Sequence, residues 1–291
     1  MKRILFAIAL FCALSSQAQL LWKVSGGGLE KPSYLFGTYH LMPSSFVDSV
    51  PGLPDAIKSV DAVWVEIEKE KMTSPATIQR MTQMMVAPAD SSIDKLMAAD
   101  GYQIVDGVVK RYLGAFGVSL DQLKTLRPAA LETQFAQLMA VKRLPNMDPA
   151  KLLDGEVERR VEELGKPSYS LETVDFQMQL LFGDPLSLQA ASLLEMCKNI
   201  EEVESNFDDM HNAYGAQDFD KLISVAFDPT LMSKGDAQKM CYDRNVKWVL
   251  VIVDAAQKGS ILVAVGAAHL GMEKGLIELL RQQGFTVEPV K

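Results

Sequence analysis

Two segments near opposite ends of the chain share one pattern, an apolar strand that ends in Gly-x-x-His. The first covers residues 33–40 and the second residues 261–269. In parallel α/β sheets, ligands bind beyond the carboxyl ends of the strands, so a histidine just past such an end points into the crevice. The repeated pattern therefore predicts one sheet built from both ends of the chain, with His40 and His269 meeting at one edge.

The other patterns place further strands near both ends and helices between them. Strand patterns cover residues 20–24, 33–38, 62–67, 169–171, 261–265 and 286–290, and helix patterns cover residues 54–60, 74–118, 121–142, 148–164, 177–214, 218–225, 245–257 and 274–283. The strand–helix–strand order of residues 33–67 predicts parallel pairing with a right-handed crossover. We expect an α/β fold with a central, largely parallel or mixed sheet from the N- and C-terminal parts. It forms one domain, residues 19–291, with a helical insertion at about 74–235.

Residues 1–18 have the three parts of a secretory signal peptide. Lys2 and Arg3 precede an apolar run, and a small-x-small cleavage site ends at Ala18. Neither this run nor any later stretch approaches the roughly 20 apolar residues that a membrane span needs. Cys12 follows Phe11 rather than a small residue, so we do not expect it to be a lipid-anchored cysteine. We expect a secreted or periplasmic protein without stable membrane insertion; a retained N-terminal helix is the alternative.

The charge of the chain excludes two classes of partner. Removal of residues 1–18, whose charged residues are Lys2 and Arg3, leaves 273 residues and changes the net charge from −8 to −10. Nucleic acid and anionic membrane surfaces both require a basic patch, so neither is expected as a partner.

Two cysteines remain after residue 18, Cys197 and Cys241. An even number in an oxidising compartment is compatible with a disulfide, which would close a loop of roughly 45 residues and contribute about 3 to 4 kcal/mol. Two buried free thiols are equally compatible with the sequence.

Carboxylates provide a third group beside the two histidines. Glu66 lies near the carboxyl end of an apolar strand, where a charged side chain is costly unless it is paired or bound to a metal. Glu172 follows another short strand, and Arg244 and Asn245 open the last long helix. These three residues are candidates to orient substrate or to pair with Glu66; a structural ion pair is the alternative. The third histidine, His211, lies in a helical stretch and is expected to be structural.

Two neutral imidazoles and a carboxylate suit a divalent Mn, Co or Zn ion with an open position for water. A metal-bound water is acidic enough to attack a carbonyl near neutral pH. Without a metal, one histidine would act as a general base assisted by Glu66. The chain has no Gly-x-Ser-x-Gly elbow, P-loop or dinucleotide fingerprint, which disfavours those enzyme classes.

The same residues carry a family resemblance, through the motifs Gly37-Thr38-Tyr39-His40, Glu66 after its strand, Leu171-Glu172-Thr173, Arg244-Asn245 and Gly266-Ala267-Ala268-His269-Leu270. From about residue 21 to 290 the chain resembles the TraB/PrgY/GumN family, which includes the Tiki metalloproteases. The resemblance implies a fold shared distantly with erythromycin esterases and ChaN-like haem-binding lipoproteins. It also implies metal-dependent peptide-bond hydrolysis that involves His40, Glu66 and His269.

The leading hypothesis is a secreted metal-dependent peptidase that acts on a peptide or protein substrate. His40, Glu66 and His269 would bind the metal or activate water, and Arg244 would position substrate or the developing oxyanion. Gly37, Gly266, Glu172 and Asn245 would support them. One alternative is a non-catalytic module that captures peptide or haem in the same crevice. The resemblance implies this possibility too, because TraB and PrgY members are linked to shutting down peptide pheromones, where sequestering the peptide would serve as well as cutting it. Another is a metal-independent esterase with His40 or His269 as base.

Overall fold

The computed structural model describes residues 19–229 and 232–291. The predicted signal peptide, with Cys12 and the cleavage site after Ala18, lies outside the described residues. Among the helices that are described, none is long and apolar enough to cross a membrane.

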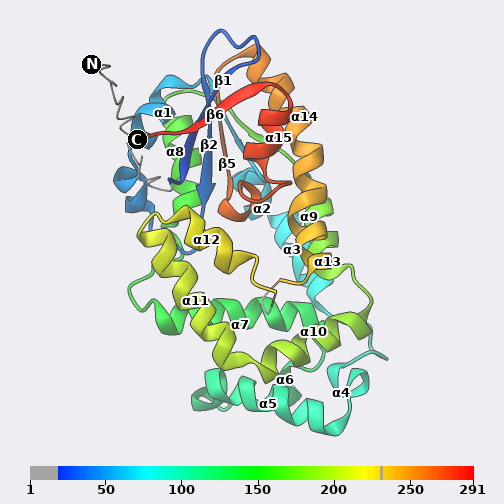
Figure 1. Ribbon diagram of the computed structural model, residues 1–291. Coiled ribbons are helices and arrows are strands. Elements are labelled where there is room, and N and C mark those ends of the chain that lie inside the picture. The colour runs from blue at the N-terminus through cyan, green and yellow to red at the C-terminus, as the bar shows by residue number, and fades with distance from the viewer. Residues whose placement is uncertain (1–18, 230–231) are drawn as a thin grey trace, which may run out of the picture.

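A mixed sheet forms one end of the molecule (Figure 1). Its strands within the described residues are β1 (Leu21–Gly26), β2 (Ser33–Thr38), β3 (Ala62–Val65), β4 (Ser168–Ser170), β5 (Ile261–Gly266) and β6 (Phe285–Pro289). They lie in the order β4-β3-β5-β2-β1-β6. Pairing is parallel from β4 through β3 and β5 to β2, and antiparallel between β2 and β1 and between β1 and β6. The expected α/β fold, with one sheet from both ends of the chain, is confirmed.

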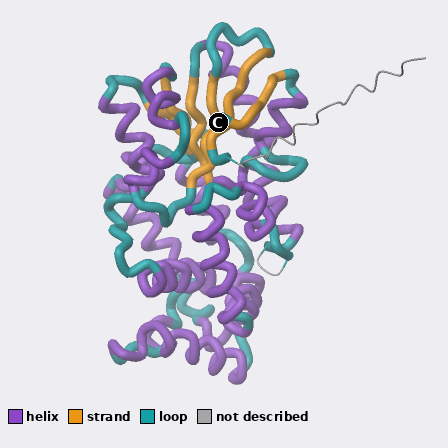
Figure 2. Tube along the Cα trace, turned by 60° about the vertical axis from the view of Figure 1, so that its left-hand side comes forward, coloured by secondary structure: helices purple, strands orange, loops and turns teal. Residues whose placement is uncertain are grey.

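The C-terminal strand β5 lies in the middle of the parallel part of the sheet. It pairs with β2 on one side and with β3 on the other, so β2 and β3 are parallel but not adjacent. The first five residues of β5 are buried, which is typical of a strand covered on both faces. Helices flank the strands on both sides (Figures 1 and 2). The two ends of the chain are thus joined at the centre of the fold.

Helices and short helical turns make up most of the remaining chain. The helices are α1 (Leu53–Ser59), α2 (Lys69–Thr73), α3 (Pro75–Met85), α4 (Ile93–Leu96), α5 (Ala99–Leu113), α6 (Leu120–Leu123), α7 (Pro128–Arg143), α8 (Leu153–Glu163), α9 (Val174–Phe182), α10 (Leu186–Lys198), α11 (Ile200–Gly215), α12 (Phe219–Ala226), α13 (Lys234–Ala237), α14 (Asp243–Lys258) and α15 (Leu276–Gln282). The turns are the 3-10 segments η1 (Ser44–Ser49), η2 (Gly114–Phe116) and η4 (Ala267–His269), and the π-helical segment η3 (Gln238–Tyr242).

Three long helical stretches expected from the sequence are divided in the structure. One of them, residues 74–118, falls within α3, α4, α5 and η2. Residues 121–142 were expected to be continuous, but they split into α6 and α7 because Pro128 lacks a backbone N–H and takes the first position of α7. Residues 177–214 fall within α9, α10 and α11, and Pro185 stands at the break between the first two. The apolar periodicity of the sequence predicted the helical regions but not the points at which the helices are interrupted.

The described residues contain two apolar cores. The larger surrounds the sheet and includes buried side chains of α8, α14 and α15. The second lies among α5, α7, α10 and α11, the helices drawn away from the sheet in Figure 1. The helical part therefore has a core of its own below the carboxyl ends of the strands.

Both cysteines are buried free thiols. Cys197 packs in the second core, on α10, and Cys241 lies in η3. The structure thus follows the free-thiol alternative, and burial raises the pKa of both thiols.

Candidate functional site

The carboxyl ends of four parallel strands meet at one edge of the sheet, and each delivers a residue predicted from the sequence. Glu172 follows β4, Glu66 directly follows β3, and His40 follows β2. His269 ends η4, the turn that continues β5. Because these strands are neighbours in the order β4-β3-β5-β2, both carboxylates and both histidines project from adjacent positions along the edge.

Arg244 lies between these side chains and bonds to three of them. Its Nη2 is 2.6 Å from Glu66 Oε2 and 2.8 Å from Glu172 Oε1, and its Nε donates to Glu172 Oε2 at 3.0 Å. Its Nη1 donates to His269 Nε2 at 3.0 Å and to the backbone oxygen of Met240 at 2.9 Å. A guanidinium has five N–H donors, and these contacts use all five. Arg244 therefore has no donor left for a substrate oxygen while this network is intact.

The helix that carries Arg244 fixes it from two further directions. The π-helical turn η3 leads directly into α14 and provides the Met240 carbonyl; such turns often occur at functional sites. One helical turn after Arg244, the Trp248 ring lies 4.5 Å from the guanidinium carbon and 4.5 Å from the His269 ring. Arg244, Trp248 and His269 thus form one packed unit.

The orientation of His269 is set by Asn245. The Asn245 amide nitrogen donates to two backbone oxygens, those of His269 at 3.0 Å and Lys274 at 2.8 Å, so its Oδ1 must face the His269 ring. That oxygen is 2.7 Å from His269 Nδ1, which therefore carries the ring proton. The lone pair of Nε2 then accepts from Arg244. Burial lowers the pKa of His269 to about 4, so the ring is neutral near pH 7.

Glu66 is ionised in this setting. Burial alone would raise its pKa, but the positive charges of Arg244 and His40 and the N–H of Gly266 lower it to about 2. The Gly266 N–H donates to Glu66 Oε1 at 3.0 Å, and His269 Nε2 is 3.8 Å from the same oxygen. The carboxylate is therefore a fixed negative charge beside a neutral imidazole.

His40 differs from His269 in being open to solvent. Its side chain is 70% exposed, and its Nδ1 is 3.1 Å from Asp154 Oδ2 at the start of α8. The charge and hydrogen bond of Asp154 raise the pKa of His40, and Glu66 contributes in the same direction. His40 also lowers the pKa of His269, which is the electrostatic consequence of the two rings sharing one region.

The two glycines of the Gly-x-x-His segments make room for close contacts. A Cβ on Gly37 would lie 3.0 Å from the Cα and Cβ of Ala267, so only glycine lets η4 cross β2 at this distance. A Cβ on Gly266 would lie 3.4 Å from Glu66 Oε1, which is tight but less severe. Neither glycine has a positive φ, so close approach rather than backbone bending explains them.

Three residues of this region were missed by the sequence analysis. Asp154 bonds to His40, Gln177 Nε2 lies 3.5 Å from Glu66 Oε2, and Trp248 packs on Arg244 and His269. Trp248 was within reach of prediction, since it is four residues from Arg244 on one helix face. Asp154 and Gln177 stand in helices far from their partners in the sequence, with no motif to mark them. His211, expected to be structural, lies outside this network with its ring 6.1 Å from that of Tyr39.

The donor chemistry of the site fits a divalent cation, although its present arrangement does not form one. In the described residues no three His, Cys, Asp or Glu side chains are grouped as metal ligands. Arg244 Nη1 engages the His269 lone pair that a metal would use. Yet Glu66 is ionised, and each imidazole has its Nδ1 held by a partner, as is usual for histidine ligands. Metal binding therefore requires Arg244 Nη1 to release His269 Nε2.

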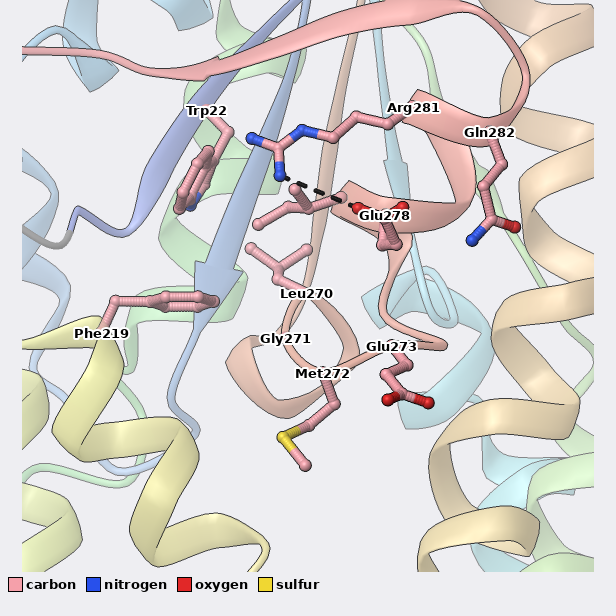
Figure 3. A pocket seen from close by; sticks show the side chains of 10 residues that line it. Trp22, Phe219, Leu270, Gly271, Met272, Glu273, Glu278, Arg281 and Gln282 are labelled. Atoms are coloured by element: carbon pink, nitrogen blue, oxygen red, sulfur yellow. Dashed lines mark ion pairs between the residues drawn. The ribbon is translucent and has the colours of Figure 1, made fainter.

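A cavity of about 600 Å³ lies beside the segment that follows His269 (Figure 3). Trp22 and Phe219 form an aromatic wall, with ring centroids 5.6 Å apart, and the Glu278–Arg281 pair stands on the opposite side. None of the strand-end residues lines it. The cavity is thus adjacent to the histidine region in sequence but separate from it.

The sequence model of the TraB/PrgY/gumN family matches residues 20–289. Among curated proteins, the zebrafish (Danio rerio) Metalloprotease TIKI2 is 23% identical, over 92% of this chain and 60% of its own length. Metalloprotease TIKI1 of the same fish and the Metalloprotease TIKI homolog of Amphimedon queenslandica are each 21% identical, over 92% and 94% of this chain. The chain spans about 60% of the length of these relatives. No solved structure matches.

Proposed function

The chain belongs to the TraB/PrgY/gumN family, and from that membership and the strand-end cluster we propose that it hydrolyses peptide bonds. The observation that carries the proposal is that His40, Glu66 and His269 follow three adjacent strand ends, with Glu66 and His269 both bonded to a buried arginine. The relatives are named metalloproteases, so hydrolysis of a peptide or protein is the chemistry the family membership favours. Because the chain spans only part of those relatives, their activity is proposed here rather than transferred.

Without a bound metal ion, His40 moves the proton in this proposal, because an Nε2 that ligates a metal cannot also act as a base. Its side chain is the exposed member of the cluster, and its Nδ1 is held by Asp154, which leaves Nε2 free to face substrate. Because Asp154 raises the pKa of His40 to about 9, the ring takes a proton from the attacking water at Nε2 in its neutral form, above that pH, and returns it to the leaving amine. The neutral, buried His269 keeps its lone pair directed toward Glu66 and Arg244 and does not exchange protons near pH 7.

Arg244 acts through its charge rather than as a donor to substrate. Its five N–H groups are occupied, so it stabilises a developing oxyanion by its electrostatic field in a region of low dielectric. Glu172 holds this charge in place with two hydrogen bonds. Of the two roles expected from the sequence, positioning substrate or the developing oxyanion, this proposal gives Arg244 the second.

A divalent ion, Mn, Co or Zn, would be held by His40, Glu66 and His269 and would supply an acidified water when bound. The relatives' name supports a metal cofactor. This chain's own contribution is to keep Glu66 ionised, His269 neutral and both Nδ1 atoms engaged, so that no buried group has to lose a proton. Arg244 Nη1 must still release His269 Nε2. Secretion or periplasmic export through the predicted signal peptide is part of the same proposal.

The proposal is tested by incubating the purified protein with a peptide library and identifying products by mass spectrometry. The assay is run with Mn, Co or Zn and again with a chelator, using the wild type, His40→Ala and His211→Ala. We expect internal peptide cleavage that His40→Ala abolishes and that His211→Ala, the matched control outside the cluster, retains.

Equal cleavage by the wild type and His40→Ala would remove His40 from the mechanism. Tight binding of peptide that is recovered intact would instead favour the capture alternative. Cleavage that continues unchanged with chelator present would favour the metal-independent esterase-like chemistry.

A further inference from the structure

His40 is held by a residue far away in the sequence that no motif marks. Its Nδ1 is 3.1 Å from Asp154 Oδ2, and the two residues are 114 positions apart. The Asp154 side chain is 34% exposed, so most of its surface is covered. An ionised carboxylate only accepts hydrogen bonds, so Nδ1 of His40 must be the donor.

The backbone around Asp154 is joined to the segment that carries His40. The Leu153 N–H donates to the Met42 oxygen at 2.9 Å, and the Ser44 N–H donates to the Lys151 oxygen at 2.9 Å. Asp154 stands in the first turn of α8, where the helix dipole favours a carboxylate. Backbone and helix end thus fix the carboxylate beside the ring, independently of the side-chain contact itself.

The arrangement repeats what Asn245 does for His269. Asn245 Oδ1 faces His269 Nδ1 at 2.7 Å, and Asp154 Oδ2 faces His40 Nδ1 at 3.1 Å. In both rings the proton is held at Nδ1 and Nε2 is left without a protein acceptor. A free neutral imidazole has no partner to enforce this tautomer, so each ring needs an acceptor at Nδ1.

We propose that Asp154 is the positioning residue of His40, which fixes the ring orientation and the Nδ1–H tautomer so that Nε2 is presented to substrate or to a metal ion. This role rests on the proposed function of His40, but the orientation itself is a property of the free protein. Asp154 acts through His40 and does not touch the reacting atoms.

The tautomer is measured directly, since the chain has three histidines. Long-range ¹H–¹⁵N spectra of ¹⁵N-histidine-labelled protein, recorded at alkaline pH where the rings are neutral, identify the protonated nitrogen of each ring. His40→Ala and His211→Ala assign the signals. The variants are Asp154→Ala, which removes the acceptor, and Asp154→Asn, which retains an acceptor oxygen without the charge.

We expect the Nδ1–H form of His40 in the wild type and in Asp154→Asn, and its loss in Asp154→Ala, with the His269 signals unchanged in all three. An Nε2–H form in the wild type would overturn the proposal, and so would an Nδ1–H form that persists in Asp154→Ala. Should Asp154→Ala fail to fold, Asp154→Ser, which retains a favourable helix-start residue but is too short to reach the ring, takes its place under the same criteria.

A second measurement separates this role from a merely structural one. Co²⁺ affinity, followed by its visible absorption, should fall about 10- to 100-fold in Asp154→Ala, the usual loss on removing a partner of a histidine ligand. Asp55→Asn, at the exposed start of α1, is the control for losing a helix-start carboxylate and should leave the affinity unchanged. An unchanged affinity in Asp154→Ala contradicts the proposal. If the wild type binds no Co²⁺, the metal part of the proposed function fails while the tautomer result still decides the role of Asp154.

Discussion

At the scale of single residues, the centre of the site is a charge balance around Arg244. One guanidinium faces two carboxylates and a neutral imidazole, with all five N–H donors used. The Arg244 and Glu172 side chains are each only 5% exposed, so neither charge can be hydrated by bulk water if its partner is removed. Removing one partner from a buried pair is costly because the other charge stays behind.

Arg244→Met should therefore reduce the free energy of unfolding by about 3 to 5 kcal/mol, measured by urea denaturation. The matched control is Arg80→Met, because Arg80 pairs with Asp175 on the surface, where both side chains are more than half exposed. That change should cost less than about 1 kcal/mol. Equal losses in the two variants would mean that the buried network contributes little to the stability of the fold.

Sequence reasoning named most of the residues in this cluster but not how they bond. The predicted residues either follow a strand end or open a helix, and both kinds of position can be recognised from the sequence. They are His40, Glu66, Glu172, Arg244 and His269. The sequence could not show that all five N–H donors of Arg244 are used, because its partners depend on how β3, β4 and η4 approach one another in space. Asp154 was missed for the same reason.

At the scale of elements, the crossing of η4 over β2 joins the two Gly-x-x-His segments. Gly37 lies under Ala267, and its backbone oxygen accepts a 2.7 Å hydrogen bond from the buried Tyr214 hydroxyl of α11. The end of β2 is thus packed from two directions. All six strands expected from the sequence overlap strands of the described structure, with ends that differ by at most two residues. The largest differences include β3, which ends at Val65, two residues earlier than expected.

Gly37→Ala should force η4 away from β2 because the added Cβ would lie 3.0 Å from Ala267. We expect a loss of about 1 to 3 kcal/mol in unfolding free energy, the usual cost of overpacking, together with lower kcat/KM as His269 shifts. Gly107→Ala is the control: nothing lies within 4 Å of its Cβ position in α5, and alanine there should stabilise by about 0.5 to 1 kcal/mol. The same sign of effect in both variants would contradict the close-approach explanation.

At the scale of the whole molecule, the strand order brings residues about 230 positions apart to one edge. The placement of β5 between β2 and β3 could not be read from the sequence, because local patterns do not specify which strands are neighbours. The helical part adds a second core and the half-buried Glu132 of α7, one carboxyl oxygen of which has no hydrogen-bond partner among the described residues. Burial raises the pKa of Glu132 to about 7.

The Glu132 carboxyl should make the stability of the folded protein depend on pH. Its pKa is about 7 when folded and about 4.5 when unfolded, so between these values the folded protein retains a proton that the unfolded chain has lost. The contribution of Glu132 therefore falls as pH rises from 4.5 to 7 and stays low above that. At pH 8, Glu132→Gln should have a free energy of unfolding about 2 kcal/mol higher than the wild type, measured by urea denaturation. At pH 4 the two proteins should be equally stable.

The exposed Glu202 of α11 provides the matched control, since Glu202→Gln should change stability little at either pH. A gain in Glu132→Gln that is the same at both pH values would show that the carboxyl is not protonated in the folded protein.

The most direct test of the account is a double-mutant cycle on the two histidines from opposite ends of the chain. kcat/KM for peptide cleavage is measured for the wild type, His40→Ala, His269→Ala and the double variant. If the two rings serve one centre, either single change removes nearly all activity and the double variant is no worse than the single ones. Losses that multiply in the double variant, or a single variant with wild-type activity, would contradict a shared centre.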